Sequence, residues 1–315
     1  MFKHKDSWYS VIFFVVLCQV LLFSPSQVFE PVLKVSYPSK ADLVLEGFSV
    51  IQAPYESGEK INIQAEHANV FQEQDVVLLD IIHGFLEDKE GKRFFFESKK
   101  GQYFPSEQKV VAQDRVTMRL PQGYEIKTEK LNYLNNGKSM SSDEHIEFSG
   151  PDLKKPELIL KGRGLFGDVE RKEYRILYEI YCEKKDFMDV GLNYTITSQS
   201  MKFLPATHKA VFVGDVHVVQ KDFLMTSDTY EVFVKSQGGE VNKAIAKGRV
   251  KIKQGERSAK AESATFINSQ KRLILKGDPE VVIGENTLRG DVIIFHTDTQ
   301  KIESYNVEGE FDEKS

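Results

Sequence analysis

The chain has 315 residues, of which 41% are hydrophobic and 28% are charged, so it is long enough for about two folded domains with apolar cores. Its formal net charge is -5, and Lys and Arg are interspersed with Asp and Glu, which excludes an extended basic surface for nucleic acid. The two cysteines, Cys18 and Cys182, and the seven scattered histidines show no metal-ligand spacing. We therefore expect no nucleic-acid partner, no metal, no cofactor and no structural disulfide.

The N-terminus contains an apolar run at residues 8–23, preceded by Lys3 and Lys5. Basic residues before such a run stay in the cytoplasm, so the rest of the chain is exported. Two interpretations stay open: an uncleaved signal anchor, and a signal peptide removed at the small residues that follow the run. We predict the anchor, one transmembrane helix within residues 1–30. Its membrane residues would include Trp8, Tyr9, Val11 and Phe23.

From residue 42 onward, apolar side chains recur at every second position. Examples are the stretches 61–65, with Ile, Ile and Ala, and 116–120, with Val, Met and Leu. This alternation is typical of half-buried strands. Turn-forming sequences such as Gly277-Asp278-Pro279 and Gly284-Glu285-Asn286 separate the alternating stretches. The pattern predicts an all-β chain.

Two segments allow other interpretations. Residues 168–185 have a composition that also suits a helix, but Ile176, Tyr178 and Ile180 alternate with their neighbours, so we predict a strand. Residues 162–167 form a literal G-x-G-x-x-G sequence, which is found in dinucleotide-binding sites. No alternation of strands and helices surrounds it, so we predict a glycine-rich turn at the end of a first domain.

The C-terminal third contains a repeat. The sequences KAVFVGDVHVVQ, starting at Lys209, and KAIAKGRVKIKQ, starting at Lys243, match at a constant shift of 34 residues, and a looser third copy starts at Leu273. The side-chain period inside each unit is two, so the units are β-structure. We expect each to contain a strand, a turn at Gly214 or Gly248, a strand, a polar turn and a strand. Stacked units of this type form a solenoid or an elongated jelly roll.

Both parts of the exported chain resemble known transport proteins. The repeat, with GDVHVVQ and GRVKIKQ followed by TSDTYEVFV and AESATFINS, resembles the OstA-like domain of the lipopolysaccharide-transport protein LptA over residues 194–311. Residues 42–180, with ADLVLEGFSVIQ and INIQAEHANVF, resemble the periplasmic domain of its membrane-anchored partner LptC. In the family these are usually two polypeptides, whereas here they form one chain.

The resemblance implies two consecutive open β-jelly-roll domains, residues 31–185 and 186–315, after the transmembrane helix. It further implies a single-pass inner-membrane protein with periplasmic domains, which is not an enzyme. Its apolar groove would carry lipopolysaccharide from an inner-membrane ABC transporter complex toward an outer-membrane lipopolysaccharide translocon or further LptA-like units. Because open rolls leave unpaired edge strands, we also predict that the two grooves are joined.

The side chains at the apolar alternate positions of each strand would line this groove. In the second domain the predicted lining residues are Val216, Val218, Phe223, Met225, Val250, Ile252, Phe266, Leu273, Leu275, Ile293 and Phe295. In the first domain they are Ile63, Ala65, Val116, Met118, Leu120, Leu158 and Leu160. For each of them, packing in a closed core is the other open interpretation.

Parts of the sequence also allow two other functions. The carboxylate pairs Asp228 with Glu231 and Asp291 with Asp298 have the residue types that glycoside hydrolysis needs, but acids at turns and on polar strand faces also serve solubility. The rival to transport is a periplasmic or surface β-solenoid that acts as a structural or polysaccharide-binding adaptor. Such an adaptor would present aromatic side chains outward, whereas a lipid carrier keeps apolar side chains inside.

Overall fold

The computed structural model describes residues 40–52, 60–87, 91, 93–120, 123–134, 139–168, 171, 173–186, 193–235, 241–299, 301–306 and 308–310. The predicted membrane anchor, with Trp8, Tyr9, Val11 and Phe23, lies outside these residues. The described part consists of antiparallel β-strands, their turns and two three-residue 3-10 helices, η3 (Pro205–Thr207) and η4 (Asn268–Gln270), so the all-β prediction is confirmed. Within that part, no helix has the length and apolarity needed to cross a membrane.

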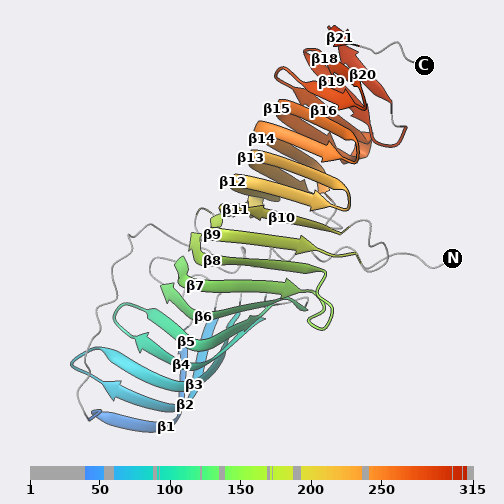
Figure 1. The fold of residues 1–315 in the computed structure, drawn as a ribbon. Coiled ribbons are helices and arrows are strands. Elements are labelled where there is room, and N and C mark those ends of the chain that lie inside the picture. The colour runs from blue at the N-terminus through green and yellow to red at the C-terminus, as the bar shows by residue number, and fades with distance from the viewer. Residues whose placement is uncertain are drawn as a thin grey trace, which may run out of the picture. The chain divides into compact units, whose positions relative to one another are not determined.

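Two compact units make up the chain, and each is described by itself. The N-terminal unit contains the described residues up to 156 together with Lys161–Ile176. From β1 to β7 its strands pair in sequence order (Figure 1). These strands are β1 (Leu43–Gln52), β2 (Lys60–Phe71), β3 (Val76–Glu87), β4 (Arg93–Phe104), β5 (Lys109–Arg119), β6 (Glu125–Leu134) and β7 (Ser139–Gly150). Strands β8 (Leu158–Asp168) and β9 (Glu173–Lys184) contribute residues to both units.

The C-terminal unit contains Glu157–Leu160 and the residues from Leu177 onward. Two of its long strands each pair with two short ones: β12 pairs with β10 and β11, and β15 pairs with β16 and β17. After β9, its strands are β10 (Tyr194–Ser198), β11 (Ser200–Leu204), β12 (Lys209–Gln220), β13 (Phe223–Val234), β14 (Val241–Gln254), β15 (Arg257–Ile267), β16 (Arg272–Lys276), β17 (Glu280–Ile283), β18 (Asn286–Arg289), β19 (Val292–His296), β20 (Ile302–Tyr305) and β21 (Glu308–Glu310).

The long strands bend part-way along their length, and bulges mark several of the bends (Figure 1). Strand β12 shifts its register at Gly214, β14 at Gly248 and β5 at Asp114. The backbone φ angles there are +81°, +76° and +64°. A bulge inserts an extra residue, and a left-handed φ is easiest for glycine. The bends thus divide each long strand into two halves.

The bulges correct one prediction about the repeat. Gly214 and Gly248 were expected to form turns between strands, but each lies inside a continuous strand. A side chain at Gly214 would overlap the Gln199 amide, and one at Gly248 would overlap the Asp228 carboxylate. The 34-residue repeat therefore reflects a glycine bulge that is present in β12 and again in β14, with a polar side chain lying over each glycine.

The glycine-rich segment at residues 162–167 also differs from the prediction, because it lies within strand β8 and forms no turn. Gly164 has a φ of +73°, which is the left-handed conformation found at the other bends. A side chain on Gly167 would meet Met140 and Tyr174 at 2.8 and 3.0 Å, so close packing explains this glycine. The predicted strand within 168–185 is confirmed as β9.

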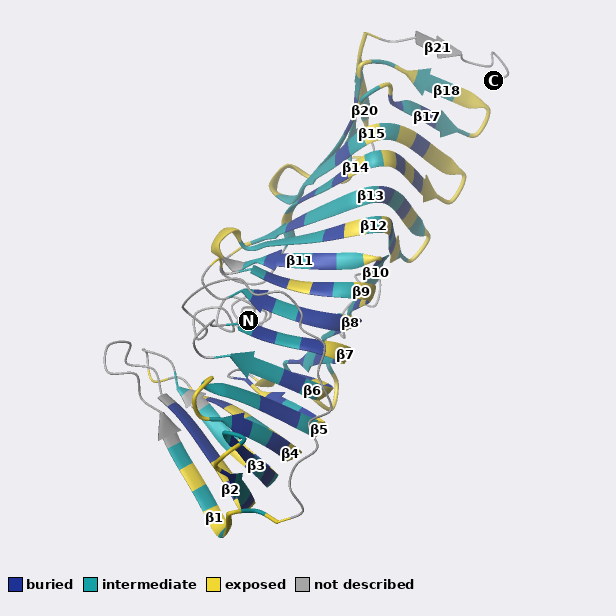
Figure 2. Ribbon diagram, turned by 90° about the vertical axis from the view of Figure 1, so that its left-hand side faces the viewer, coloured by how far each residue is buried: buried dark blue, intermediate teal, exposed yellow. Residues whose placement is uncertain are grey.

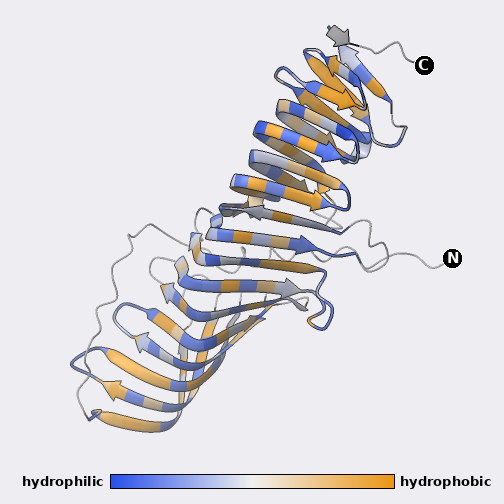
Figure 3. Cartoon of the chain, in the orientation of Figure 1, coloured by the Kyte–Doolittle hydropathy of each residue, from blue (hydrophilic) through white to orange (hydrophobic). Residues whose placement is uncertain are grey.

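Consecutive outward-facing residues at each bend return the apolar side chains to the inside. In β2, for example, Ile63 and Ala65 are buried, Glu66 and His67 are exposed, and Ala68 is buried again. Residues from both sides of the bend pack in one cluster, which includes Ile63 and Ala68. Figure 2 shows buried segments on both sides of the bends, and Figure 3 shows hydrophobic and hydrophilic residues alternating along the strands.

Buried hydroxyl groups accompany the bends of several strands. Ser98 in β4, Ser198 at the end of β10 and Ser227 in β13 each donate a hydrogen bond to the carbonyl oxygen two residues later, at 3.0–3.1 Å. Thr128 in β6 does the same at 3.3 Å and also lies 3.2 Å from the hydroxyl of Ser142 in β7. These local bonds satisfy carbonyls that the bend removes from the regular ladder.

Candidate functional site

The inner face of the C-terminal unit carries an apolar row that crosses its strands. Its members are directly opposite one another in successive strand pairs, and all but the last are buried. They are Cys182, Ile196, Val218, Met225, Ile252, Ala259, Val281 and Leu288. Adjacent strands lie about 4.8 Å apart, so this first row is roughly 34 Å long.

A second row crosses the same unit on the other side of the bend. It contains Phe203, Ala210, Val232, Ala244, Phe266, Leu273, Phe295 and Ile302. Phe266, Leu273 and Phe295 are directly paired and only half-buried. Their large apolar surfaces are therefore not fully covered by the protein itself, which leaves room for contact with an apolar ligand.

The N-terminal unit has the same arrangement. One row contains Val50, Ile63, Gly84, Phe96, Met118, Ile126 and Phe148. The row on the other side of the bend contains Leu43, Val70, Val77, Tyr103, Val110, Tyr133 and Met140. Each unit therefore carries paired apolar rows that run perpendicular to its strands.

The structure places none of the predicted groove residues on the exposed surface. The buried ones are Ile63, Ala65, Val116, Met118, Leu120, Leu160, Val216, Val218, Met225, Val250, Ile252, Leu275 and Ile293. The half-buried ones are Leu158, Phe223, Phe266, Leu273 and Phe295. Burial is common to a closed core and to a lipid-binding interior, so their role in binding lipid stays a prediction.

Sequence reasoning missed the inner residues on the other side of each bend. These are Phe212 in β12, Val232 in β13, and Ala244 and Ala246 in β14, all of which are buried. In β12 and β14 the missed residues have the same parity as the predicted ones, and the bulges at Gly214 and Gly248 place three residues between the two buried segments of each strand. The repeated glycines were the available signal, because a glycine at a fixed place in successive strands marks a bulge.

The titratable groups on the inner side of β9, β10 and β13 stay uncharged at neutral pH. Burial raises the pKa of the Cys182 thiol to about 12, with a smaller contribution from Glu183. Burial also raises the pKa of Tyr230 to about 12 and holds the pKa of Tyr194 above its usual value. These shifts are typical of an apolar, water-poor environment.

The four carboxylates weighed as catalytic groups have structural partners. Asp228 forms an ion pair with Arg249, and this hydrogen bond lowers the pKa of Asp228. Glu231 lies 2.7 Å from the Lys209 ammonium and 3.2 Å from that of Lys247. Asp291 accepts a hydrogen bond from Asn306, and Asp298 accepts one from the backbone of Thr299. These bonds account for the acids as parts of the strand and turn framework.

Comparison with known proteins assigns both parts of the chain. A family described as "Lipopolysaccharide-assembly, LptC-related" matches residues 9–181, and one described as "LptA/(LptD N-terminal domain) LPS transport protein" matches residues 195–301. Among solved structures, LptH from Pseudomonas aeruginosa, described as the LptA-homologous periplasmic component of the lipopolysaccharide transport device, is 17% identical with a TM-score of 0.35. That similarity covers 38% of this chain and 94% of LptH. A search of curated proteins gave no match.

These matches define the class of protein: a β-strand protein of lipopolysaccharide transport that joins an LptC-like and an LptA-like part in one chain. The first match covers more than half of the sequence, so the chain belongs to the LptC-related lipopolysaccharide-assembly family. The resemblance stated from the sequence is thereby confirmed.

Proposed function

We propose that the apolar rows of the two units hold the acyl chains of lipopolysaccharide while it crosses the periplasm. The observation that carries this proposal is the continuity of the rows across successive strands, on both sides of the bend in each unit. Each methylene exposed to water costs about 0.8 kcal/mol, so a lipid with several acyl chains needs an apolar surface along its whole path. The proposal includes the joining of the two interiors into one path.

The proposed source of cargo is an inner-membrane ABC transporter complex, and the proposed acceptor is an outer-membrane translocon or a further LptA-like unit. The chain itself acts as a carrier and performs no catalysis. The bonded carboxylates and the uncharged Cys182 and Tyr230 support this assignment. Energy for directional transport would come from the transporter.

The proposed location is the inner membrane, with the apolar run at residues 8–23 as an uncleaved anchor and both units in the periplasm. Basic residues before the run and an exported family support this orientation. Alkaline extraction of cell membranes tests it. An anchored chain stays with the membrane pellet, whereas a chain whose segment has been removed is released into the supernatant.

Photo-crosslinking in living cells tests the carrier function. A photoreactive phenylalanine analogue at Phe266 preserves the aromatic ring of a half-buried member of the second row. We expect adducts with lipopolysaccharide at this position, because an acyl chain lying on the row would contact the ring. The matched control is Lys251, which is exposed on β14 and should give none.

Absence of adducts at Phe266, in a chain that is folded and abundant, would contradict the proposal and favour the structural-adaptor function. Equal yields at Phe266 and Lys251 would also contradict it, since the contact would then be unspecific. The experiment is repeated at Val250, which is 1% exposed. Adducts there would show that lipid reaches the interior, and their absence would show a packed core at this position.

A further inference from the structure

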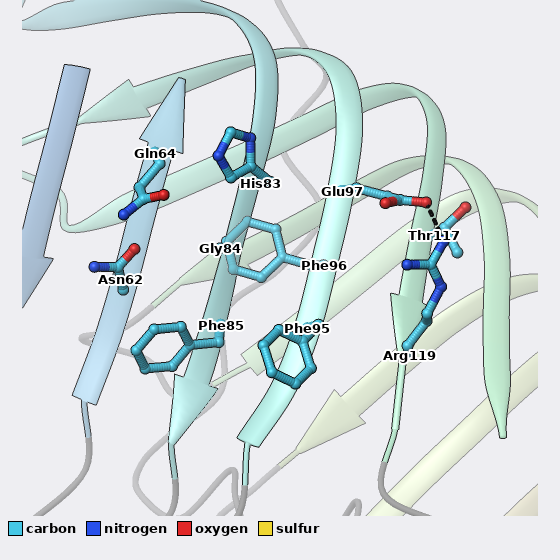
Figure 4. Close-up of a pocket in the computed structure, with 10 residues that line it drawn as sticks. All are labelled: Asn62, Gln64, His83, Gly84, Phe85, Phe95, Phe96, Glu97, Thr117 and Arg119. Carbon is cyan, nitrogen blue, oxygen red and sulfur yellow. Dashed lines mark hydrogen bonds and ion pairs between the residues drawn. The ribbon is translucent and has the colours of Figure 1, made fainter. Parts of the chain in front are cut away.

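A pocket of about 400 Å³ opens on the face of the N-terminal unit opposite to its apolar rows (Figure 4). It lies on strands β2 to β5. On β2, the lining residues Asn62 and Gln64 alternate with the buried Ile61, Ile63 and Ala65. Two lining residues, Gly84 and Phe96, belong to an inner row, but the other eight have the outward parity, so a ligand held there lies chiefly on the outer face of the sheet.

One wall of the pocket is aromatic. Phe85 of β3 and Phe95 of β4 are directly opposite in the strand pairing, with ring centroids 6.3 Å apart in an edge-to-face arrangement. Phe95 is 52% exposed although it is a large apolar side chain. The Arg93 guanidinium lies 4.4 Å from the centroid of Phe85, which fixes the orientation of that ring. The aromatic wall is thus ordered and open to a ligand.

The other outward-facing residues that line the pocket are polar and carry balanced charge. Asn62, Gln64 and His83 supply donors and acceptors from β2 and β3. Glu97 and Arg119 form an ion pair at 2.7 Å, so their charges offset each other (Figure 4). A strongly anionic ligand would meet the Glu97 carboxylate, and a bare hydrocarbon chain would leave the amides without partners.

We propose that this pocket binds a neutral saccharide. A sugar ring has an apolar face of C–H groups, which fits the exposed Phe95 ring, and a rim of hydroxyls, which fits the amides of Asn62 and Gln64 and the paired Glu97 and Arg119. A volume of about 400 Å³ lies within the range of small-molecule pockets, about 300–1,000 Å³. The sugar could belong to the cargo lipid or to a free glycan, because both present the same hydroxylated rings.

Ligand-observed NMR on the full chain tests this site. The chain is purified in a detergent without a sugar headgroup, such as lauryldimethylamine oxide, so that the detergent does not compete. Two probes are titrated to about 10 mM, which largely fills a site of millimolar Kd. One is a neutral oligosaccharide fragment of lipopolysaccharide that carries no phosphate and no acidic sugar, and the other is maltotriose. We expect saturation transfer to the sugar ring protons of at least one probe.

The variants Phe95→Ala and Gln64→Ala remove the aromatic and the polar contact separately, and each should weaken binding at least tenfold. Tyr178→Ala is the matched control, since Tyr178 is 60% exposed on β9 and lies outside the pocket. Circular dichroism confirms that each variant is folded, and Gln64→Ala keeps the test decisive where Phe95→Ala disturbs the sheet.

Binding of the lipopolysaccharide oligosaccharide alone would assign the site to the cargo, and binding of maltotriose would assign it to neutral glycans in general. The proposal is overturned where neither probe binds, or where both pocket variants bind as the wild type does. The crosslinking result at Phe266 is independent of these outcomes, because Phe266 lies in the C-terminal unit on an inner row.

Discussion

The two units solve the same structural problem with different residues. In the C-terminal unit the bends of β12 and β14 use Gly214 and Gly248, and a polar side chain lies over each glycine. In the N-terminal unit, Gly47 of β1 and Gly164 of β8 are also left-handed, but the bends of β3 and β5 place Ile81 and Asp114 in this region, with φ angles of +53° and +64°. Only the C-terminal solution recurs as a sequence repeat.

The comparison indicates that the 34-residue repeat arises from the residue types that form the bend. Both units carry paired apolar rows, so the inner face alone does not require a 34-residue period. A bulge glycine with an acidic or amide side chain lying over it is a specific combination. It restricts the residue type at two positions, the glycine itself and the residue that covers it. Where Ile81 or Asp114 takes the glycine's place, that combination is absent and the sequence looks irregular.

The largest expected effect comes from truncating the core of one unit at a time. Leu79→Ala in the N-terminal unit and Leu275→Ala in the C-terminal unit each remove a side chain that is at most 2% exposed. Each should lower the free energy of unfolding of its own unit by about 2–5 kcal/mol, because a cavity replaces packed atoms. Hydrogen exchange in increasing denaturant, followed by peptides from each unit, measures the two effects separately.

Val213→Ala is the control for this pair, since Val213 is 41% exposed and its loss should change stability by less than about 0.5 kcal/mol. Equal loss of protection in both units after either leucine substitution would show that they unfold as one, and would remove the basis for treating them separately.

A smaller effect is expected from the glycine that defines the C-terminal bend. Gly248→Ala combines a left-handed φ with overlap of the new methyl group and the Asp228 carboxylate. We expect a loss of about 2–3 kcal/mol in the free energy of unfolding, measured by denaturant titration. Gly255→Ala is matched to it, because Gly255 also has a positive φ, +56°, but no atom lies within 4 Å of the added methyl group. That variant should lose only about 1 kcal/mol, and equal losses would show that the Asp228 contact has no role.

The smallest effect concerns pH and the C-terminal unit. Burial pushes the pKa of Glu231 upward, but hydrogen bonds from Lys209 and Lys247 outweigh it and hold the pKa below its usual value. The ion pairs therefore contribute stability above the unfolded-state pKa of about 4.3, and this contribution is lost as the pH falls through the lower folded-state pKa. Because Lys247 is largely exposed, the contribution is below about 1 kcal/mol.

Denaturant titrations between pH 6 and pH 2 check this expectation. The wild type should lose more stability over that interval than Glu231→Gln, which has no carboxylate to protonate. Glu256→Gln, in the exposed turn between β14 and β15, controls for the loss of one negative charge. Parallel pH profiles for the wild type and Glu231→Gln would contradict the assignment.

The strands and their family could be predicted from local pattern, whereas the geometry of the bends could not. Alternation at 61–65 and 116–120 correctly indicated strands, and the turns at Gly277 and Gly284 are where the sequence places them. The same alternation misled at Tyr178, which has the parity of the buried Ile176 and Ile180 but is 60% exposed. Glu179, with a φ of +58°, marks a bend at which Tyr178 and Glu179 both face outward, and burial resumes with the same parity at Ile180.

The outer pocket was invisible to the sequence for a related reason. Phe85 and Phe95 come together because β3 and β4 pair in a register that sets them directly opposite. They are ten positions apart in the sequence, with turn-forming residues between them, and no local period links them. Register depends on the partner strand, so pairs of this kind follow only from the assembled sheet.

The bend of the C-terminal unit also makes its length adjustable. Each 34-residue segment brings two strands, one bulge glycine and the polar side chain that lies over the glycine of the next segment, so a segment contacts chiefly its immediate neighbours. Tandem duplication of one segment would then insert two strands without disturbing the rest. Each apolar row would grow by roughly 10 Å, at about 4.8 Å per strand, which offers a modular way to match a carrier of this kind to the width of its compartment.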